Sequence, residues 1–429
     1  MNPSLLRPAP VFLILAFLSS ALSLYWHEHS ILLTAFAAYM AYSLICIRSF
    51  SPVKLILLLI SLTIYLYFSA VTPEASLRIE KSLVIFCAFI LAATTLKIAT
   101  VNISSLQELR EIIAEMGRNK QKTSVAIASL GSGAFISFGA IPLIYNLFNS
   151  NRDLALPIQR GFSLIPMISP FSVTFVLMTT MLFPVDFNTV FEHALPIVSV
   201  FLAIAILDSI RRDKTAAPAK REPRQVDHKR LMLSAFYLMS CVLIIALVYF
   251  LSELPLSKSF IPASILILTA TALLTGKQKA IQQEIVKSSA TFHSEATILL
   301  FSAAIGSLIT EVNRQTQWVD LSPYLHSPII TLILPIIIIG ASALAISPLI
   351  TVAILCSFIA PYADQITNKE AFYLCITAGW SLSMCISPIS ITNLLIARET
   401  GIPVRQLYQT NYLYLSLCIL VLTLVSTFG

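Results

Sequence analysis

The stretch GFSLIPMISPFSVTF, Gly161 to Phe175, recurs as GWSLSMCISPISITN, Gly379 to Asn393. The two stretches align without a gap at an offset of 218 and share eight of fifteen residues, namely Gly, Ser, Leu, Ile, Ser, Pro, Ser and Thr. Apolar segments seldom match by chance in Gly, Ser-Pro and Thr together, so the pair indicates an internal repeat. Upstream, Gly131 to Ser137 loosely resembles Gly340 to Ser347.

Each repeated stretch is apolar but contains Ser-Pro, at Ser169-Pro170 and at Ser387-Pro388. Proline lacks the N–H and clashes with the preceding turn of a helix. Unpaired backbone groups cost several kcal/mol in hydrocarbon, so helices stay whole there unless the gap lines a cavity. Two matched breaks therefore predict a binding site near mid-membrane.

The chemistry expected at these breaks uses backbone groups and small polar side chains. Freed carbonyls at Ser169 and Ser387 are candidate Na⁺ ligands, and the helix N-terminus that follows each break suits an anion. Hydroxyls and one amide add further contacts: Ser172, Thr174, Ser390, Thr392 and Asn393. The alternative is that the Ser-Pro kinks and small residues serve only helix packing.

Composition places the chain in a bilayer. Of its 429 residues, 57% are hydrophobic and 11% charged, and the mean hydropathy is +0.84; soluble proteins carry about 25% charged residues. The net charge of +7 is spread over short segments between apolar runs, which excludes nucleic-acid binding. We expect an all-α polytopic membrane protein of about eleven transmembrane spans, because span-length apolar stretches recur along the sequence.

The expected organisation has five parts. These are N-terminal scaffold helices at 1–98, a first repeat at 99–210, a basic loop at 211–230, linking scaffold helices at 231–276 and a second repeat at 277–429. Val11 to Trp26 is expected to be a first span, the alternative being a signal peptide. Ile103 to Met116 is either a helix lying flat at the interface or an ordinary loop helix.

The positions of the basic residues predict the topology. With a cytoplasmic N-terminus and two re-entrant hairpins, at Thr123–Phe148 and Pro328–Pro361, 23 of the 28 basic residues lie inside. The five outside are Arg78, Lys81, Lys258, Arg314 and Lys369. This predicts a multi-pass protein of the cytoplasmic (inner) membrane, with the 211–230 loop inside and the two halves forming an inverted repeat.

Titratable groups are scarce at the predicted site. No Asp or Glu lies in either hairpin or break, which disfavours a proton relay there. Asp208, Glu295 and Glu311 flank spans and are expected at the interface. Arg160, just before the first break, either draws anions or anchors the chain at the interface. No histidine or cysteine spacing predicts a metal site, and we expect no cofactor beyond a coupling ion.

The paired hairpins and Ser-Pro breaks resemble the ion transporter superfamily over about Asn102 to Phe428. This group includes divalent anion–sodium symporters, citrate carriers, arsenite permeases and large subunits of tripartite transporters. The resemblance implies an elevator mechanism, often a homodimer, and hairpin tips that meet the helix breaks. It implies a binding site formed by small polar and break residues: Ser132, Gly133, Ser137, Ser169, Pro170, Ser172, Thr174, Ser342, Ser347, Ser387, Pro388, Ser390, Thr392 and Asn393. Neither expected tip, at Gly131–Gly133 or Gly340–Ser342, carries the Ser-Asn-Thr of the anion–sodium symporters.

The function expected from the sequence is secondary active transport of a small anionic solute coupled to Na⁺ or H⁺. A membrane-embedded enzyme is one alternative, but the chain has no Gly-x-Ser-x-Gly and no His-Glu-x-x-His. A channel or a non-transporting assembly subunit is the other. The solute, the direction of transport and any accessory subunit are not predicted.

Overall fold

The computed structural model describes residues 9–26, 28–47, 50–101, 117–136, 152–170, 172–183, 185–212, 228–252, 254, 256–316 and 328–428. Over these residues the chain forms helices and no strands. Ser137, the Ile103–Met116 segment and most of the 211–230 loop lie outside the described residues.

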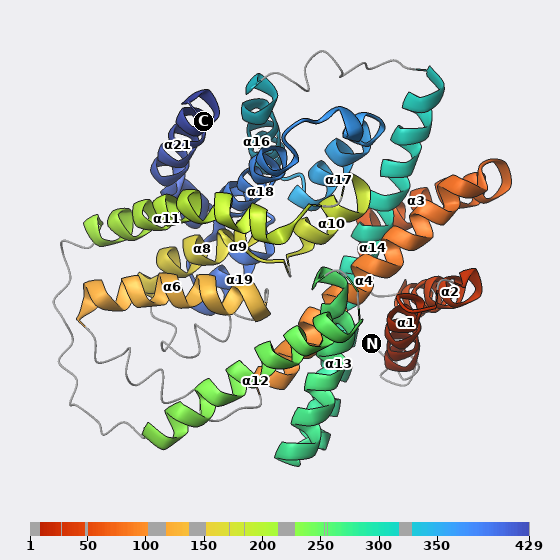
Figure 1. The fold of residues 1–429 in the computed structure, drawn as a ribbon, viewed down its shortest axis with the longest axis horizontal. Coiled ribbons are helices and arrows are strands. Elements are labelled where there is room, and N and C mark those ends of the chain that lie inside the picture. Colours follow the sequence, from red (N-terminus) through yellow and green to blue (C-terminus); the bar gives the residue numbers. More distant parts are fainter. Residues whose placement is uncertain are drawn as a thin grey trace.

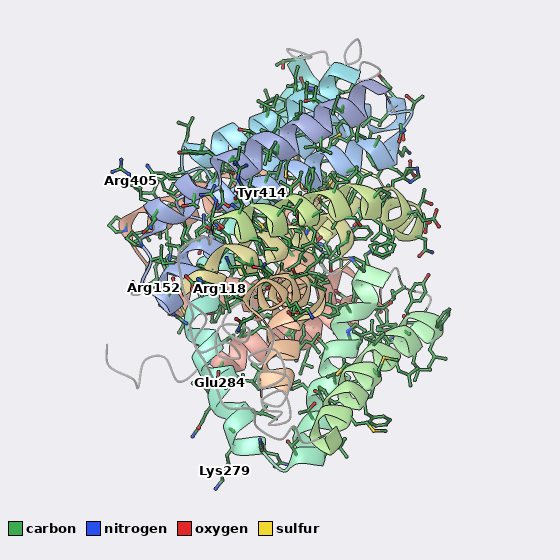
Figure 2. The ribbon with its side chains drawn as sticks, turned by 90° about the vertical axis from the view of Figure 1, so that its left-hand side faces the viewer. Arg118, Arg152, Lys279, Glu284, Arg405 and Tyr414 are labelled. Carbon is green, nitrogen blue, oxygen red and sulfur yellow. The ribbon has the colours of Figure 1, made fainter. Side chains whose placement is uncertain are left out.

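One group of helices comes from the N-terminal part and the middle of the chain. It consists of α1 (Ala9–Ser23), α2 (His29–Ile45), α3 (Pro52–Val71), α4 (Pro73–Val101), α12 (His228–Ser252), α13 (Leu256–Thr275) and α14 (Gln278–Thr316). Helix α4 packs against both α13 and α14, and α14 packs against α3. At the exposed end of α14, Lys279 and Glu284 lie at the edge of the molecule (Figure 2).

The second group contains both repeated stretches, and Figure 1 shows it beside the first. It consists of α6 (Arg118–Ile136), η3 (Arg152–Leu154), α8 (Ala155–Ser163), α9 (Ile165–Ile168), α10 (Val173–Met181), α11 (Phe187–Arg211), α16 (Pro328–Ala343), α17 (Pro348–Ile359), η4 (Ala360–Gln365), α18 (Lys369–Ile386), α19 (Ile391–Thr400), α20 (Val404–Thr410) and α21 (Tyr412–Phe428). Helices α10 and α17 touch the first group, at α4 and α14 respectively.

The helices confirm the predicted class of an all-helical membrane protein. Within the described residues, seven helices are long and apolar enough to cross a membrane, or up to eight if α20 and α21, bent by 41°, form one span. Shorter apolar helices occur at Ala9–Ser23, His29–Ile45, Met239–Ser252 and Ile330–Ala343.

The glycines expected at the two hairpin tips lie within helices, and residues 137–148 of the first hairpin lie outside the described residues. Helix α6 runs through Gly131 and Gly133 to Ile136, and α16 runs through Gly340 and Ser342 to Ala343. The turn between α16 and α17 begins at Leu344, and Ala345 takes a positive φ of 63°. The predicted tips at Gly131–Gly133 and Gly340–Ser342 are therefore wrong. A glycine in an apolar stretch need not mark a turn: Gly133 permits close packing, and Gly131 and Gly340 lie on open helix faces.

A different pair of glycines, equivalent in the two repeats, permits close packing between helices. A Cβ at Gly161 of α8 would overlap the backbone of Ala126 in α6, and a Cβ at Gly379 of α18 would lie 2.7 Å from the Cα of Pro335 in α16. Gly161 and Gly379 are related by the offset of 218. Ala126 and Pro335 are related by 209, the offset that aligns Gly131 with Gly340. The same backbone contact thus recurs in both halves of the chain.

Candidate functional site

The first break lies where the sequence predicts it. Helix α9 ends at Ile168, Ser169 is extended, and α10 begins at Val173 after Ser172, whose hydroxyl accepts a hydrogen bond from the Phe175 amide. The Ser169 hydroxyl donates to the Ala134 carbonyl of α6 at 2.7 Å. The break is therefore fastened to α6, next to its C-terminal end.

The second break is also confirmed. Helix α18 ends at Ile386, Ser387 is extended, and α19 begins at Ile391. Asn393 donates from its side-chain amide to the Ser387 carbonyl at 2.8 Å, so it bridges the gap from the far side. The side chains of Ser387, Thr392 and Asn393 are fully buried.

The two broken segments cross in opposite directions. The Gln159 amide donates to Asn393 Oδ1, the Cys385 thiol donates to Ser163 Oγ at 3.2 Å, and the Tyr373 hydroxyl donates to the Pro166 carbonyl at 3.4 Å. As the residue number rises along the first segment, that of its partner falls along the second. Residues from the two halves of the sequence therefore form one buried centre.

Several buried hydroxyls in the second half of the chain have no partner. Among the described residues, five buried side-chain oxygens make no hydrogen bond within the protein, those of Ser342, Ser381, Ser387, Thr392 and Tyr414. Buried polar atoms in native structures are almost always bonded. Three of these five residues, Ser342, Ser387 and Thr392, belong to the site predicted from sequence.

The backbone oxygens proposed as Na⁺ ligands are already bonded. The Ser169 carbonyl accepts from the Ser172 amide at 3.2 Å. The Ser387 carbonyl accepts from the Ser390 amide at 3.3 Å as well as from Asn393. An ion at the Ser387 carbonyl would have to replace one of these donors, whereas the hydroxyls of Ser387 and Thr392 have no protein partner to replace.

A buried ion pair adjoins the crossing. Arg160 is fully buried, and its Nη2 lies 2.7 Å from Asp208 Oδ2 of α11. Its guanidinium also donates to Asn411 Oδ1 at 2.8 Å and lies over the Tyr414 ring, 4.8 Å from the centroid. Arg160 is thus no exposed anchor, and Asp208 is shielded by protein. Sequence reasoning missed this pairing, although both residues stand out as charges at the ends of apolar stretches.

Asn411 and Gln159 extend the same network to the second break. The Asn411 amide donates to Gln159 Oε1 at 2.8 Å and to the Cys385 carbonyl at 3.2 Å. Because Gln159 also reaches Asn393, the chain of polar contacts runs from Asp208 to Ser387. The sequence carries no local signal for Gln159 or Asn411, since each partner lies far away along the chain.

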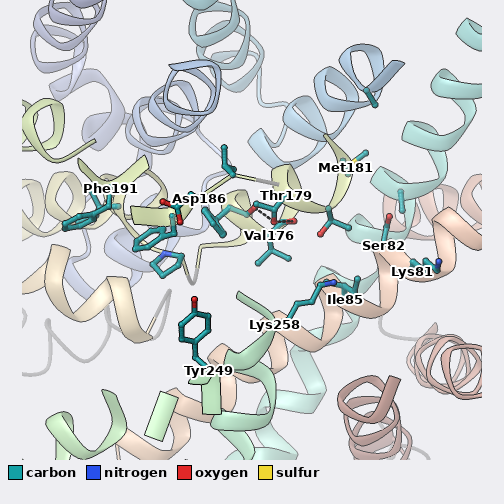
Figure 3. Close-up of a pocket in the computed structure, with 18 of the residues that line it drawn as sticks. Lys81, Ser82, Ile85, Val176, Thr179, Met181, Asp186, Phe191, Tyr249 and Lys258 are labelled. Carbon is teal, nitrogen blue, oxygen red and sulfur yellow. Dashed lines mark hydrogen bonds between the residues drawn. The ribbon is translucent and has the colours of Figure 1, made fainter. Parts of the chain in front are cut away.

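A cavity of about 1110 Å³ opens between the two groups of helices (Figure 3). The first break and α6 contribute Pro170, Ile168, Gly131 and Ala134 to its wall, and α10 contributes Phe175, Val176 and Thr179. The opposite walls come from α4, α12, α13 and α14. Asp186 also lines the cavity, and its hydrogen bonds with Thr189 lower the pKa of its carboxyl, which is therefore ionised at neutral pH.

The remaining residues of the predicted site lie within helices or at their starts, away from the crossing of the two broken segments or without a contact that links them to it. Ser132 donates to the Ala128 carbonyl within α6, and Gly133 packs against Phe162 and Ile165. Ser347 precedes α17, and its carbonyl accepts from the Thr351 amide at 3.1 Å. Thr174 and Ser390 are buried at the starts of α10 and α19. No group of three or more His, Cys, Asp or Glu side chains that could hold a metal occurs in the described ranges.

The helices and their polar centre define an all-helical membrane protein with two broken helices. Its fold is similar to that of the YdaH transporter of Alcanivorax borkumensis, whose crystal structure is described as revealing an unusual topology, with a TM-score of 0.50. The similarity covers 87% of this chain and 96% of that chain at 12% sequence identity, and so concerns the fold alone. No family model and no curated protein matches the sequence.

Proposed function

We propose that the chain is a secondary active transporter of a small anionic solute, coupled to Na⁺ or H⁺. The observation that carries the proposal is the set of buried, unpartnered hydroxyls of Ser342, Ser387 and Thr392. Leaving a buried polar atom unbonded costs about 1–3 kcal/mol. A bound solute or ion that accepts from or coordinates these oxygens would remove that cost.

Elevator-type alternating access in the inner membrane is part of the proposal. Carriers often use inverted repeats with broken helices at mid-membrane. The recurring contacts of Gly161 and Gly379, and the opposite directions in which the broken segments cross, support such a repeat. Helices α1–α4 and α12–α14 would form the scaffold, against which the second group moves. The N-terminus and the 211–230 loop would face the cytoplasm.

Transport is favoured over the two alternatives, a membrane enzyme and a channel or assembly subunit. One solved structure with a similar fold is that of a transporter. The polar centre holds amides, hydroxyls, the Cys385 thiol and the Arg160–Asp208 ion pair, and among its described residues no nucleophile lies beside a free base.

The sequence resemblance also implies a homodimer, which light scattering of the purified protein would test.

The direct test is uptake into proteoliposomes. Purified protein would be reconstituted and offered a panel of radiolabelled organic acids under imposed Na⁺ and proton gradients, with empty liposomes as the control. We expect uptake of at least one acid that collapses when one of the two gradients is dissipated. Folded protein that moves no acid under either gradient would contradict the proposal. Stepwise single-channel conductance would instead assign the chain to channels.

A further inference from the structure

The cavity between the helix groups has an unusual charge balance. Arg78, Lys81 and Lys258 line it, against the single carboxylate of Asp186. Figure 3 shows Lys258 extending from α13 towards the cavity, with Asp186 on the facing side. Three cations opposite one carboxylate give the lining a net positive charge that attracts anions.

The same cations are exceptions to the distribution of charge along the chain. Basic residues of membrane proteins gather on the cytoplasmic side, and only five of 28 are expected outside. Arg78, Lys81 and Lys258 are three of those five and share this cavity. A fourth, Arg314, lies close by, because it shares Glu311 with Arg78. Their convergence points to a function that outweighs the topological bias.

Two of the cations are available to a ligand. Arg78 Nη2 lies 3.5 Å from Glu311 Oε2. Within the described part of the chain, neither Lys81 nor Lys258 has a carboxylate partner. Lys81 is exposed and Lys258 half-buried, so both ammonium groups are accessible and attract an anion brought by a ligand.

The rest of the lining is apolar and rich in rings. Phe175 and Phe187 pack edge to face at 5.6 Å with Phe191 on the same side, and Ile245 and Tyr249 of α12 line the opposite wall. Such walls favour an apolar body, and few polar groups are needed to orient it. Charge and wall together describe a ligand with an anionic head and an apolar body.

We propose that Lys81 and Lys258, with Arg78 beside them, form an anion-capturing vestibule on the scaffold side that selects organic anions bearing an apolar or aromatic body. The proposal rests on the proposed transport function and names the solute class. The vestibule shares one cavity with Pro170 and Ile168, so a captured anion is held beside the first break before any movement of the helices.

The test measures binding to the full-length protein in zwitterionic nanodiscs by isothermal titration calorimetry. The probe is 2-naphthoate, compared with uncharged 2-naphthalenemethanol and with acetate, which lacks the apolar body. We expect 2-naphthoate to bind at least about tenfold more tightly than either, and each Lys→Gln change at 81 or 258 to weaken it about twofold to fivefold. The double variant should lose about tenfold, and raising the salt should reduce the differences.

A variant expected to tighten binding instead of weakening it distinguishes an effect of charge from an effect of packing. Asp186→Asn keeps the helix cap but removes the carboxylate that faces the cavity, so it should tighten 2-naphthoate binding. Lys279→Gln, on the exposed start of α14 away from the cavity, is the matched control and should change nothing. Equal affinity for the acid and the alcohol, or equal losses in Lys279→Gln and the cavity variants, would overturn the vestibule.

An anionic lipid headgroup could supply the same chemistry, so nanodiscs containing phosphatidylglycerol form a second arm. Displacement of 2-naphthoate by that lipid would assign the cations to lipid and refute capture of a soluble anion. Failure of the vestibule is distinguishable from failure of transport. Gradient-driven uptake that is unchanged by substitution of Lys81 and Lys258 would refute the vestibule alone. Charge-dependent binding without uptake would refute the transport function.

Discussion

Gly161 lies so close to Ala126 that a Cβ on the glycine would overlap the alanine carbonyl oxygen. The equivalent Gly379 meets Pro335 in the same way, although the aligned partners share no side-chain chemistry. What the two halves have in common is thus a backbone approach that only a residue without Cβ permits. It sets how closely each broken helix packs on its neighbour.

Replacing these glycines should therefore destabilise the protein. Gly161→Ala and Gly379→Ala are each expected to cost about 1–3 kcal/mol, since the helices must separate to admit a methyl group. Gly340→Ala is the control, because a Cβ at Gly340 meets no atom within 4 Å. Apparent Tm in detergent measures the difference, and equal Tm values for Gly379→Ala and Gly340→Ala would refute the close contact.

The buried ion pair should respond sharply to loss of either member. Arg160→Gln or Asp208→Asn leaves a charge without its main partner, which costs about 3–5 kcal/mol at a buried site. Arg212→Gln removes an exposed partner of the same carboxylate and should cost under about 1 kcal/mol. Unfolding in mixed micelles measures these free energies.

The double variant Arg160→Gln/Asp208→Asn tests the coupling directly. It should lose less stability than the sum of the two single changes, because no uncompensated charge is left. Additive losses would show that the two side chains act independently.

The hydroxyls of the second break should matter for transport and little for stability. Ser387→Ala and Ser390→Ala are expected to reduce uptake about tenfold, the loss of one buried hydrogen bond to the solute or ion. Expression should stay intact, and Tm should not fall in Ser387→Ala, since that hydroxyl has no protein partner. Ser416→Ala, on the exposed face of α21, is the control. Wild-type uptake in both variants would remove these residues from the site.

Asp186 predicts a dependence of stability on pH. Its side chain caps α11 through the Thr189 amide, and its folded-state pKa is lowered. The stabilisation is therefore present above the unfolded pKa and is lost as the pH falls through the lowered folded-state value. Asp186→Ala should lower the apparent Tm by about 1–2 °C at neutral pH, and the difference should vanish in strong acid. A constant difference at all pH values would contradict the cap.

Both helix breaks could be predicted because the effect of proline is local. Ser169-Pro170 and Ser387-Pro388 interrupt their helices at the expected residues, and Ser172 caps the helix that follows. The hairpin tips could not be placed in this way. A glycine in an apolar stretch marks either a turn or a close helix contact, and Gly133 is the second case, because it packs against Ile165.

The buried network was beyond sequence reasoning for a different reason. Arg160 and Asp208 each stand out as isolated charges, but their pairing depends on α8 packing against α11. Gln159 and Asn411 are 252 positions apart and meet only after both halves have assembled. Local pattern carries no information about such contacts, so only the structure could place the four residues together.

Helix α14 also offers an experimental handle. Its 39 residues span about 58 Å at about 1.5 Å per residue, roughly twice the thickness of the hydrocarbon core. The apolar part begins only at Ala296, so the turns around Lys279 extend past it as one continuous helix. A fiducial domain whose own helix continues these turns would be rigidly attached to the membrane part of the protein. It would give electron microscopy a fixed frame in which to image this 47.2 kDa chain.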